Sequence, residues 1–295
     1  MDTGPLTAKI VDAFAGMPPQ LQTAAKYVLE RPSDVALLSM REQARRAGVQ
    51  PATMTRLAKR LGLDGYDAVR ELYAQAIREG GSSFAGRAGA QVASQKSKGE
   101  RALAAEMVES IAAQIARLGG SDALDSLAKA ATTLTLARRV YCLGLRSSYP
   151  AAWHLAYVLS LLGESAIVLE AAAGMGIDPI RTATKEDALL AVSVAPYTRA
   201  TVEIAQYAHL QGIPIVAVTD SAVSPLAQIA QSAVLVSTES PSFLHTMTPA
   251  FVVCEILAAL VAGRGGERSL EALRRTEDQL TAFNIHWSPQ DGRRT

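Results

Sequence analysis

The chain has 295 residues, of which 49% are hydrophobic and 19% are charged, so it can form two folded domains and is not disordered by composition. Its 29 basic and 28 acidic residues give a net charge of +1, which excludes a uniformly basic protein that coats nucleic acid. Aromatic residues make up 5%, which argues against an all-β sandwich.

Two short helices joined by a glycine turn are predicted near the N-terminus. Ser39 followed by Glu42 is a capping box, which predicts a helix that ends at Gly48. A second helix begins at Gln50-Pro51, because proline is favoured at the first helical position, and it runs to Leu61. Its predicted core face consists of Met54, Leu57, Ala58 and Leu61. This pattern is typical of a DNA-binding helix-turn-helix.

The second of these helices is predicted to enter the major groove of DNA. Four of its residues are placed to read base edges, namely Gln50, Thr53, Thr55 and Arg56. Lys59, Arg60 and the helix N-terminus at Ser39 suit phosphate groups. Residues 39–70 carry seven basic and three acidic residues, which favours phosphate binding. The alternative is a helix pair for protein interaction with a solvated basic face.

Residues 81–99, rich in Gly, Ser, Ala and Lys, are predicted to link a domain over residues 1–80 to a second domain over residues 100–286. Residues 287–295 are predicted to be a tail. In the second domain, helices are predicted at 101–118, 122–137, 150–162 and 199–211. Strand-like runs lie at 139–143, 166–169, 188–194, 214–219 and 233–237. This alternation predicts a three-layer α/β domain with a five-stranded parallel sheet.

Polar loops follow the predicted strands at their carboxyl ends, where open α/β sheets place ligands. The first strand is followed by Arg146, Ser147 and Ser148, and backbone amides at the start of the next helix favour an anion there. The third strand ends in Ser193, with Tyr197 and Thr198 close behind. A polar strand-to-helix turn without a ligand is the alternative interpretation.

Both regions resemble one known family. Residues 22–72, which include KYVLERPSDVALLSMREQARRAGVQPATMTRLAKRLGLDGYDAVRE, resemble the N-terminal domain of the RpiR/MurR family of bacterial transcriptional regulators. Residues 138–263 resemble the C-terminal sugar isomerase (SIS) domain of that family. The resemblance implies operator DNA and a small anionic effector as partners, the effector being a sugar phosphate or a related carbohydrate-derived acid.

The chain departs from the SIS pattern in one loop. Sugar-phosphate SIS domains usually carry Ser-x-Ser-Gly-x-Thr, whereas this chain has Ser193-Val-Ala-Pro-Tyr-Thr198. One hydroxyl donor is lost at Ala195 and one backbone N–H at Pro196, because proline has none. The departure weakens the inference to a phosphorylated ligand.

We therefore predict a ligand-responsive transcriptional regulator that forms a homodimer or homotetramer in the cytoplasm, without membrane contact. The predicted ligand-binding residues are Arg146, Ser147, Ser148, Ser193, Tyr197, Thr198, Glu239 and His245. The rival function is an SIS isomerase or lyase, for which Glu239 and His245 form the one plausible acid/base pair. We expect no catalysis, because a binding loop alone suffices for a regulator, and no cofactor. We expect no metal site either, because Cys142 and Cys254 are too few for structural zinc.

Overall fold

The computed structural model describes residues 6–78, 84–170 and 176–287, which fall into two compact units. One, called the helical unit below, contains the described residues up to 114 together with 221–223 and 237–246. The other, called the sheet unit, contains residues 115–220, 224–236 and those from 247 onward. The domain boundaries predicted from the sequence remain predictions.

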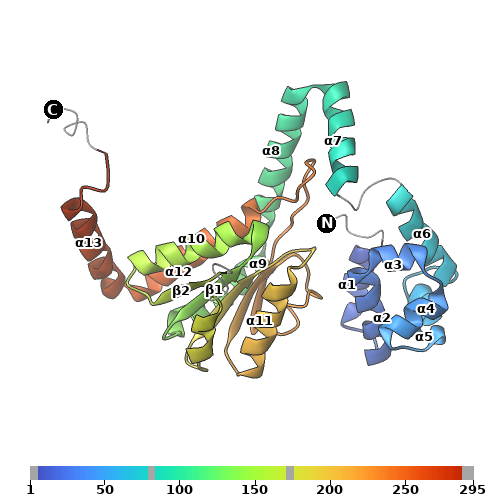
Figure 1. The fold of residues 1–295 in the computed structure, drawn as a ribbon, viewed down its shortest axis with the longest axis horizontal. Coiled ribbons are helices and arrows are strands. Elements are labelled where there is room, and N and C mark those ends of the chain that lie inside the picture. Colours follow the sequence, from blue (N-terminus) through green and yellow to red (C-terminus); the bar gives the residue numbers. More distant parts are fainter. Residues whose placement is uncertain (1–5, 79–83, 171–175, 288–295) are drawn as a thin grey trace. The chain divides into compact units, whose positions relative to one another are not determined.

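The helical unit is built from consecutive helices, labelled in Figure 1. They are α1 (Thr7–Phe14), α2 (Pro19–Glu30), α3 (Pro32–Leu37), α4 (Met40–Ala47), α5 (Pro51–Arg60), α6 (Tyr66–Arg78), α7 (Phe84–Lys98) and α8 (Glu100–Arg117). The predicted core face of α5 is confirmed, because Met54, Leu57 and Ala58 are fully buried and Leu61 is nearly so.

One buried polar group joins three helices of this core. The amide nitrogen of Gln43 donates to the carbonyl oxygens of Val35 and Leu38 at 3.0 and 2.8 Å. Its amide oxygen accepts the hydroxyl of Tyr66 at 2.6 Å. The buried glutamine is therefore satisfied at both ends and fixes α4 between α3 and α6.

The segment predicted to be a linker is largely helical, since α7 covers residues 84–98. No residue of α7 is buried, so the sequence needs no apolar period there. Its Ala, Gln, Arg and Lys residues favour a helix through their intrinsic propensity alone.

The sheet unit confirms the predicted five-stranded parallel sheet. Its strands run in the order β2-β1-β3-β4-β5, and every neighbouring pair is parallel. The strands are β1 (Val140–Gly144), β2 (Ala166–Leu169), β3 (Ala188–Val192), β4 (Ile215–Thr219) and β5 (Ser232–Leu235). The order reverses next to β1, and the loops after β1 and β3 therefore leave the same edge side by side.

Helices cover both faces of this sheet (Figure 1). On one face, α9 (Ser121–Leu136), α10 (Tyr149–Leu161) and α12 (Thr248–Gly265) pack on Cys142, Leu190 and Val218. On the other, α11 (Arg199–Leu210) packs on residues that include Leu143 and Leu189. The chain then continues into α13 (Glu267–Ala282). The three-layer prediction is confirmed.

Among the described residues, α12 is the one helix long and apolar enough to cross a membrane by length and composition. Its inward residues, among them Val253, Cys254 and Leu257, are fully buried in the core over the sheet. The packing accounts for its hydrophobicity as that of a core helix. Burial also raises the pKa of both Cys142 and Cys254, which keeps these thiols protonated and unreactive.

An ion pair between a buried carboxylate and a half-exposed guanidinium closes the amino edge of the sheet. The Arg138 guanidinium donates two parallel hydrogen bonds to the Asp187 carboxylate, at 3.0 and 2.9 Å. Asp187 also accepts the backbone N–H of Thr184 at 2.8 Å. Burial alone would raise the pKa of Asp187, but the bonds from Arg138 and Thr184 outweigh it, and the pKa is lowered from 3.8.

This ion pair predicts a pH-dependent contribution to stability. Replacing Asp187 by Asn should lower the free energy of unfolding at pH 7 by about 1–3 kcal/mol, because Arg138 loses its charged acceptor. A carboxyl whose pKa is lowered on folding contributes above its unfolded pKa and loses that contribution as the pH falls. The difference between wild type and Asp187→Asn, measured by urea unfolding, should therefore shrink below about pH 4. A difference that stays constant down to pH 2.5 would exclude the ion pair as its source.

Candidate functional site

The first candidate site is the turn between α4 and α5. Ser39 is the N-cap of α4, and its hydroxyl accepts the backbone N–H of Glu42 at 3.3 Å. Only this half of the predicted capping box forms, since the Glu42 carboxylate binds Arg45 at 2.6 and 2.9 Å and Arg46 at 2.9 Å. Hydrogen bonds from these two arginines lower the pKa of Glu42 to about 2.

Gly48 makes the predicted turn possible. Its φ of 70° is in the left-handed region, and its N–H donates back to the last carbonyls of α4. Val49 then enters the core, and Pro51 occupies the first turn of α5 as predicted. The backbone therefore forms the helix-turn-helix that the sequence predicted.

The predicted DNA-reading face is only partly exposed. Gln50, Arg56, Lys59 and Arg60 are exposed, and Thr55 is half-buried. Thr53 is 2% exposed, so its predicted place on this face is wrong. Its hydroxyl accepts the Arg56 guanidinium at 3.2 Å, which aligns the arginine along the helix. Helical periodicity did not reveal this, because Thr53 lies at the boundary between the two faces.

Two further contacts hold the exposed arginines of this unit. The guanidinium of Arg60 donates to the carbonyl oxygen of Gly16 at 2.7 Å, which fixes the end of α5 to the loop between α1 and α2. Arg46 reaches Asp34 at 3.1 Å, and Asp34 accepts the hydroxyl of Tyr27 at 3.0 Å. Burial and the Asp34 carboxylate raise the pKa of Tyr27 to about 12. These contacts tie two of the exposed arginines to neighbouring segments of the helical unit.

The second candidate site lies at the carboxyl edge of the sheet. Arg146, Ser147 and Ser148 form a short 3-10 turn between β1 and α10, and Arg146 has a φ of 57°. A side chain at Gly144 would place its Cβ 2.6 Å from the Ser148 carbonyl oxygen and 2.9 Å from Ala152. Glycine therefore allows the turn to fold back over the strand, which brings the two serines to the sheet edge.

The loop after β3 lies beside this turn and is already hydrogen-bonded internally. Ser193 is 2% exposed, and its hydroxyl accepts the Thr198 N–H at 3.4 Å. The Ala195 N–H donates to the Asp220 carboxylate at 3.3 Å, and the Thr219 hydroxyl donates to the same carboxylate at 3.4 Å. Asp220 was not among the predicted site residues, although its place directly after β4 could have indicated it.

The structure brings six of the predicted ligand residues to one edge of the sheet unit: Arg146, Ser147, Ser148, Ser193, Tyr197 and Thr198. Glu239 and His245 belong to the helical unit, in the loop of residues 237–246. Glu170 is a further acidic group at the sheet edge, and its carboxylate accepts the Tyr149 hydroxyl at 2.9 Å. This bond raises the pKa of Tyr149.

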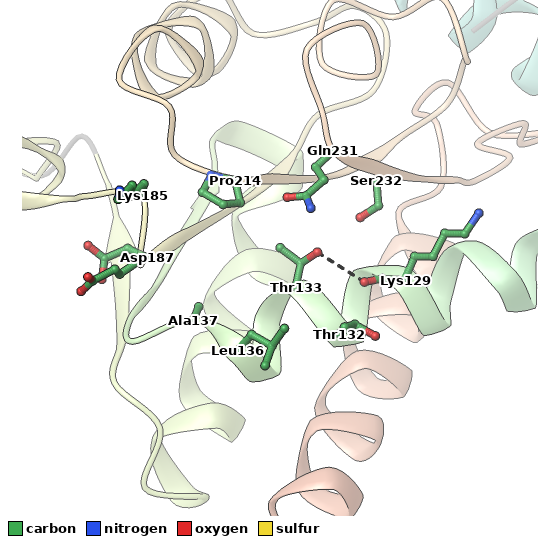
Figure 2. A pocket seen from close by; sticks show the side chains of 11 residues that line it. Lys129, Thr132, Thr133, Leu136, Ala137, Lys185, Asp187, Pro214, Gln231 and Ser232 are labelled. Atoms are coloured by element: carbon green, nitrogen blue, oxygen red, sulfur yellow. Dashed lines mark hydrogen bonds between the residues drawn. The ribbon is translucent and has the colours of Figure 1, made fainter.

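Two hollows open at opposite edges of the sheet. One of about 510 Å³ is lined by Leu145, Glu170 and Ala200, which follow β1, β2 and β3, and by Tyr207. The other, of about 420 Å³, lies at the amino edge between α9 and the starts of β3, β4 and β5 (Figure 2). None of the predicted ligand residues lines either hollow, although the first lies at the same edge of the sheet as six of them. Among the described residues, no three His, Cys, Asp or Glu side chains gather as metal ligands would.

Known protein families match both parts of the chain. The model of the helix-turn-helix domain of the rpiR family matches residues 5–79, and the SIS domain model matches residues 133–260. Among curated proteins, none matches the chain.

Solved structures similar to the chain include the following two. The sugar isomerase domain of an RpiR transcription factor from Sphaerobacter thermophilus is 26% identical, with a TM-score of 0.54, over 60% of this chain and 98% of that chain. The NanR protein of Vibrio vulnificus, complexed with ManNAc-6P, is 21% identical with a TM-score of 0.55. That match covers 94% of this chain and 98% of that one, and it shows the shared fold.

The fold and the two matched domains define a helix-turn-helix regulator with a C-terminal SIS domain. The chain belongs to the RpiR family of transcriptional regulators, as the resemblance implied.

Two glycines of the sheet unit test the geometry of the carboxyl edge. Gly144→Ala should lower the free energy of unfolding by about 1–3 kcal/mol, because the added methyl group clashes with backbone. Gly263→Ala, inside α12 with nothing within 4 Å of its Cβ, should instead raise it by about 0.5–1 kcal/mol. Chemical denaturation measures both, and equal effects of the two substitutions would contradict the close approach at Gly144.

Proposed function

We propose that this regulator binds operator DNA through α5 and that a small anionic metabolite at the carboxyl edge of the sheet changes its DNA affinity. The observation that carries the proposal is an exposed basic helix on one unit together with a polar strand edge on the other. The charge distribution supports this division of roles, because residues 138–263 carry six basic and nine acidic residues. The acidic balance of this stretch disfavours DNA along it.

On the helical unit, Gln50 and Arg56 are the proposed readers of base edges, with Thr55 at the margin of the surface. Lys59, Arg60 and the N-terminus of α4 at Ser39 are proposed to contact phosphates. Thr53 is proposed to position Arg56 rather than to touch DNA, because its hydroxyl is buried against the arginine.

Substitutions in α5 test this assignment. Arg56→Ala should weaken binding by about 1–3 kcal/mol, roughly 5- to 150-fold, because a bidentate base contact is lost. Gln50→Ala should relax base preference at one position of the site. Fluorescence anisotropy on a duplex selected from random DNA by the wild-type protein measures both effects. Arg56→Ala binding as tightly as wild type, with the same salt dependence, would show that α5 is not the recognition helix.

The effector is proposed to be a sugar phosphate or a related carbohydrate-derived acid. The complex of the similar NanR protein with ManNAc-6P supports this class. We place the anionic group at the turn of Arg146, Ser147 and Ser148, which carries two hydroxyls and a guanidinium directly before the N-terminus of α10. The loop after β3 is less suited to it, because Asp220 already accepts the Ala195 N–H and adds negative charge.

A thermal-shift comparison tests the site. Wild type, Ser147→Ala and the control Ser160→Ala are heated with ManNAc-6P, glucose 6-phosphate and gluconate. Ser160 lies on α10, the helix that follows the turn, and its hydroxyl donates to the Tyr157 carbonyl oxygen. A ligand that binds at the turn should raise the melting temperature of wild type and Ser160→Ala more than that of Ser147→Ala. A ligand that stabilises all three equally would place its site elsewhere.

We further propose binding without turnover, in a cytoplasmic homodimer or homotetramer. Helix-turn-helix proteins bind paired half-sites as dimers, which supports self-association. Exposed apolar side chains support it too, including the stacked rings of Trp153 and Tyr157 on α10. The rival is an SIS isomerase that uses Glu239 and His245. Conversion of any sugar phosphate by wild type, lost in Glu239→Gln, would establish that rival.

A further inference from the structure

The loop of residues 237–246, between β5 and α12, is hydrogen-bonded to two helices of the helical unit. The side-chain amide of Gln114 on α8 donates to the carbonyl oxygen of Glu239 at 2.6 Å. Gln91 on α7 accepts the backbone N–H of Phe243 at 3.0 Å. Within the loop, the Thr246 N–H closes onto the Thr238 carbonyl oxygen at 3.1 Å. The loop is therefore a compact element held from outside by two glutamines.

Gln114 is an unusual residue on its helix. Along the whole of α8, Leu103 and Gln114 are the buried residues, and Gln114 is 2% exposed. A buried glutamine needs a specific reason, because burial of an amide is costly unless it is hydrogen-bonded. Its nitrogen has two acceptors, the Glu239 carbonyl and the Ser110 hydroxyl at 3.1 Å. Since so little else of α8 is buried, this contact is a principal tie between the helix and the loop.

The amide oxygen of Gln114 is buried and has no hydrogen-bond partner among the described residues. The carbonyl acceptor at Glu239 fixes which end of the amide is the nitrogen, so the oxygen cannot take that place. An unsatisfied buried acceptor favours any rearrangement that brings it a donor. The loop supplies several, since Ser237, Thr238, Ser240 and Ser242 carry hydroxyls. Gln114 can therefore pair with the loop in two ways: its amide nitrogen donates to the Glu239 carbonyl oxygen, or its amide oxygen accepts a loop hydroxyl.

We propose that Gln114 couples the effector site to the DNA-binding domain, as a positioning residue that touches neither ligand. The loop begins two residues after β5, at the carboxyl end of the strand, so it leaves the sheet at the edge proposed for the effector. The helix that carries Gln114 follows the helix-turn-helix and α7 along the chain. A rearrangement of the loop changes the bond to Gln114 and therefore the placement of α8. The inference rests on the proposed function.

Reciprocity allows a test that needs no knowledge of the effector. If the loop and the DNA-binding domain are coupled, DNA binding must change the loop by the same free energy. Amide hydrogen exchange, followed by mass spectrometry with and without a saturating selected duplex, reports on residues 237–246. In wild type, DNA should change exchange in this loop by about fivefold or more. Gln114→Leu should keep DNA affinity within about twofold and abolish this response, because it removes the donor and keeps the volume.

Matched variants separate coupling from folding. Gln114→Met repeats the test with an unbranched side chain, in case Leu prevents folding. Gln95→Leu replaces an exposed glutamine of α7 whose amide reaches Glu100, and it should leave both affinity and loop response as in wild type. A loop response that persists in folded Gln114→Leu or Gln114→Met, or that is absent in DNA-bound wild type, overturns the proposal. Absence of any DNA binding by wild type overturns the proposed function itself, and this inference falls with it.

Discussion

Burial of the central strands on both faces is the constraint on which the function of the sheet unit depends. Every residue of β1, β3 and β4 is buried, so no side chain on these strands is accessible to a ligand. Polar chemistry is confined to the strand ends. At the amino edge, the Arg138–Asp187 ion pair is satisfied internally and stabilises the fold. At the carboxyl edge, turns after β1 and β3 present hydroxyls and amides side by side, and regulation is expected there.

The same polar groups serve the fold and the site, and their internal bonds decide which of them are available. Ser193 accepts a backbone N–H of its own loop, and Asp220 occupies the amide of Ala195. The donors of the β3 loop are thus partly used, and the Asp220 carboxylate adds negative charge beside them. On α5, Thr53 is buried and its hydroxyl already accepts a hydrogen bond from Arg56, so it is not a donor on the surface. A donor counts toward a binding site only after its internal partners have been identified.

The sequence predicted the architecture well because burial patterns are local. Continuous apolar runs gave all five strands, and Ser39, Gly48 and Pro51 marked the helix ends by backbone rules alone. The helix at 84–98 was not predicted, because none of its side chains is buried and its sequence therefore shows no apolar periodicity. The contact between Gln114 and Glu239 joins residues far apart in sequence, and no local pattern could reveal it. The position of Asp220 directly after β4 marks it as an edge residue, but its bond to Ala195 on another loop has no local signal.

The near-zero net charge combines a basic helix-turn-helix with an acidic sheet domain, so the two units are suited to different partners. The proposed function requires that effector bound to the sheet unit changes the affinity of the helical unit for DNA. The most direct measurement is DNA affinity at fixed salt, with and without the sugar phosphate or sugar acid that most stabilises the protein. A coupling of about 1–3 kcal/mol predicts a 5- to 150-fold change in the dissociation constant. An unchanged dissociation constant at saturating ligand would contradict the account.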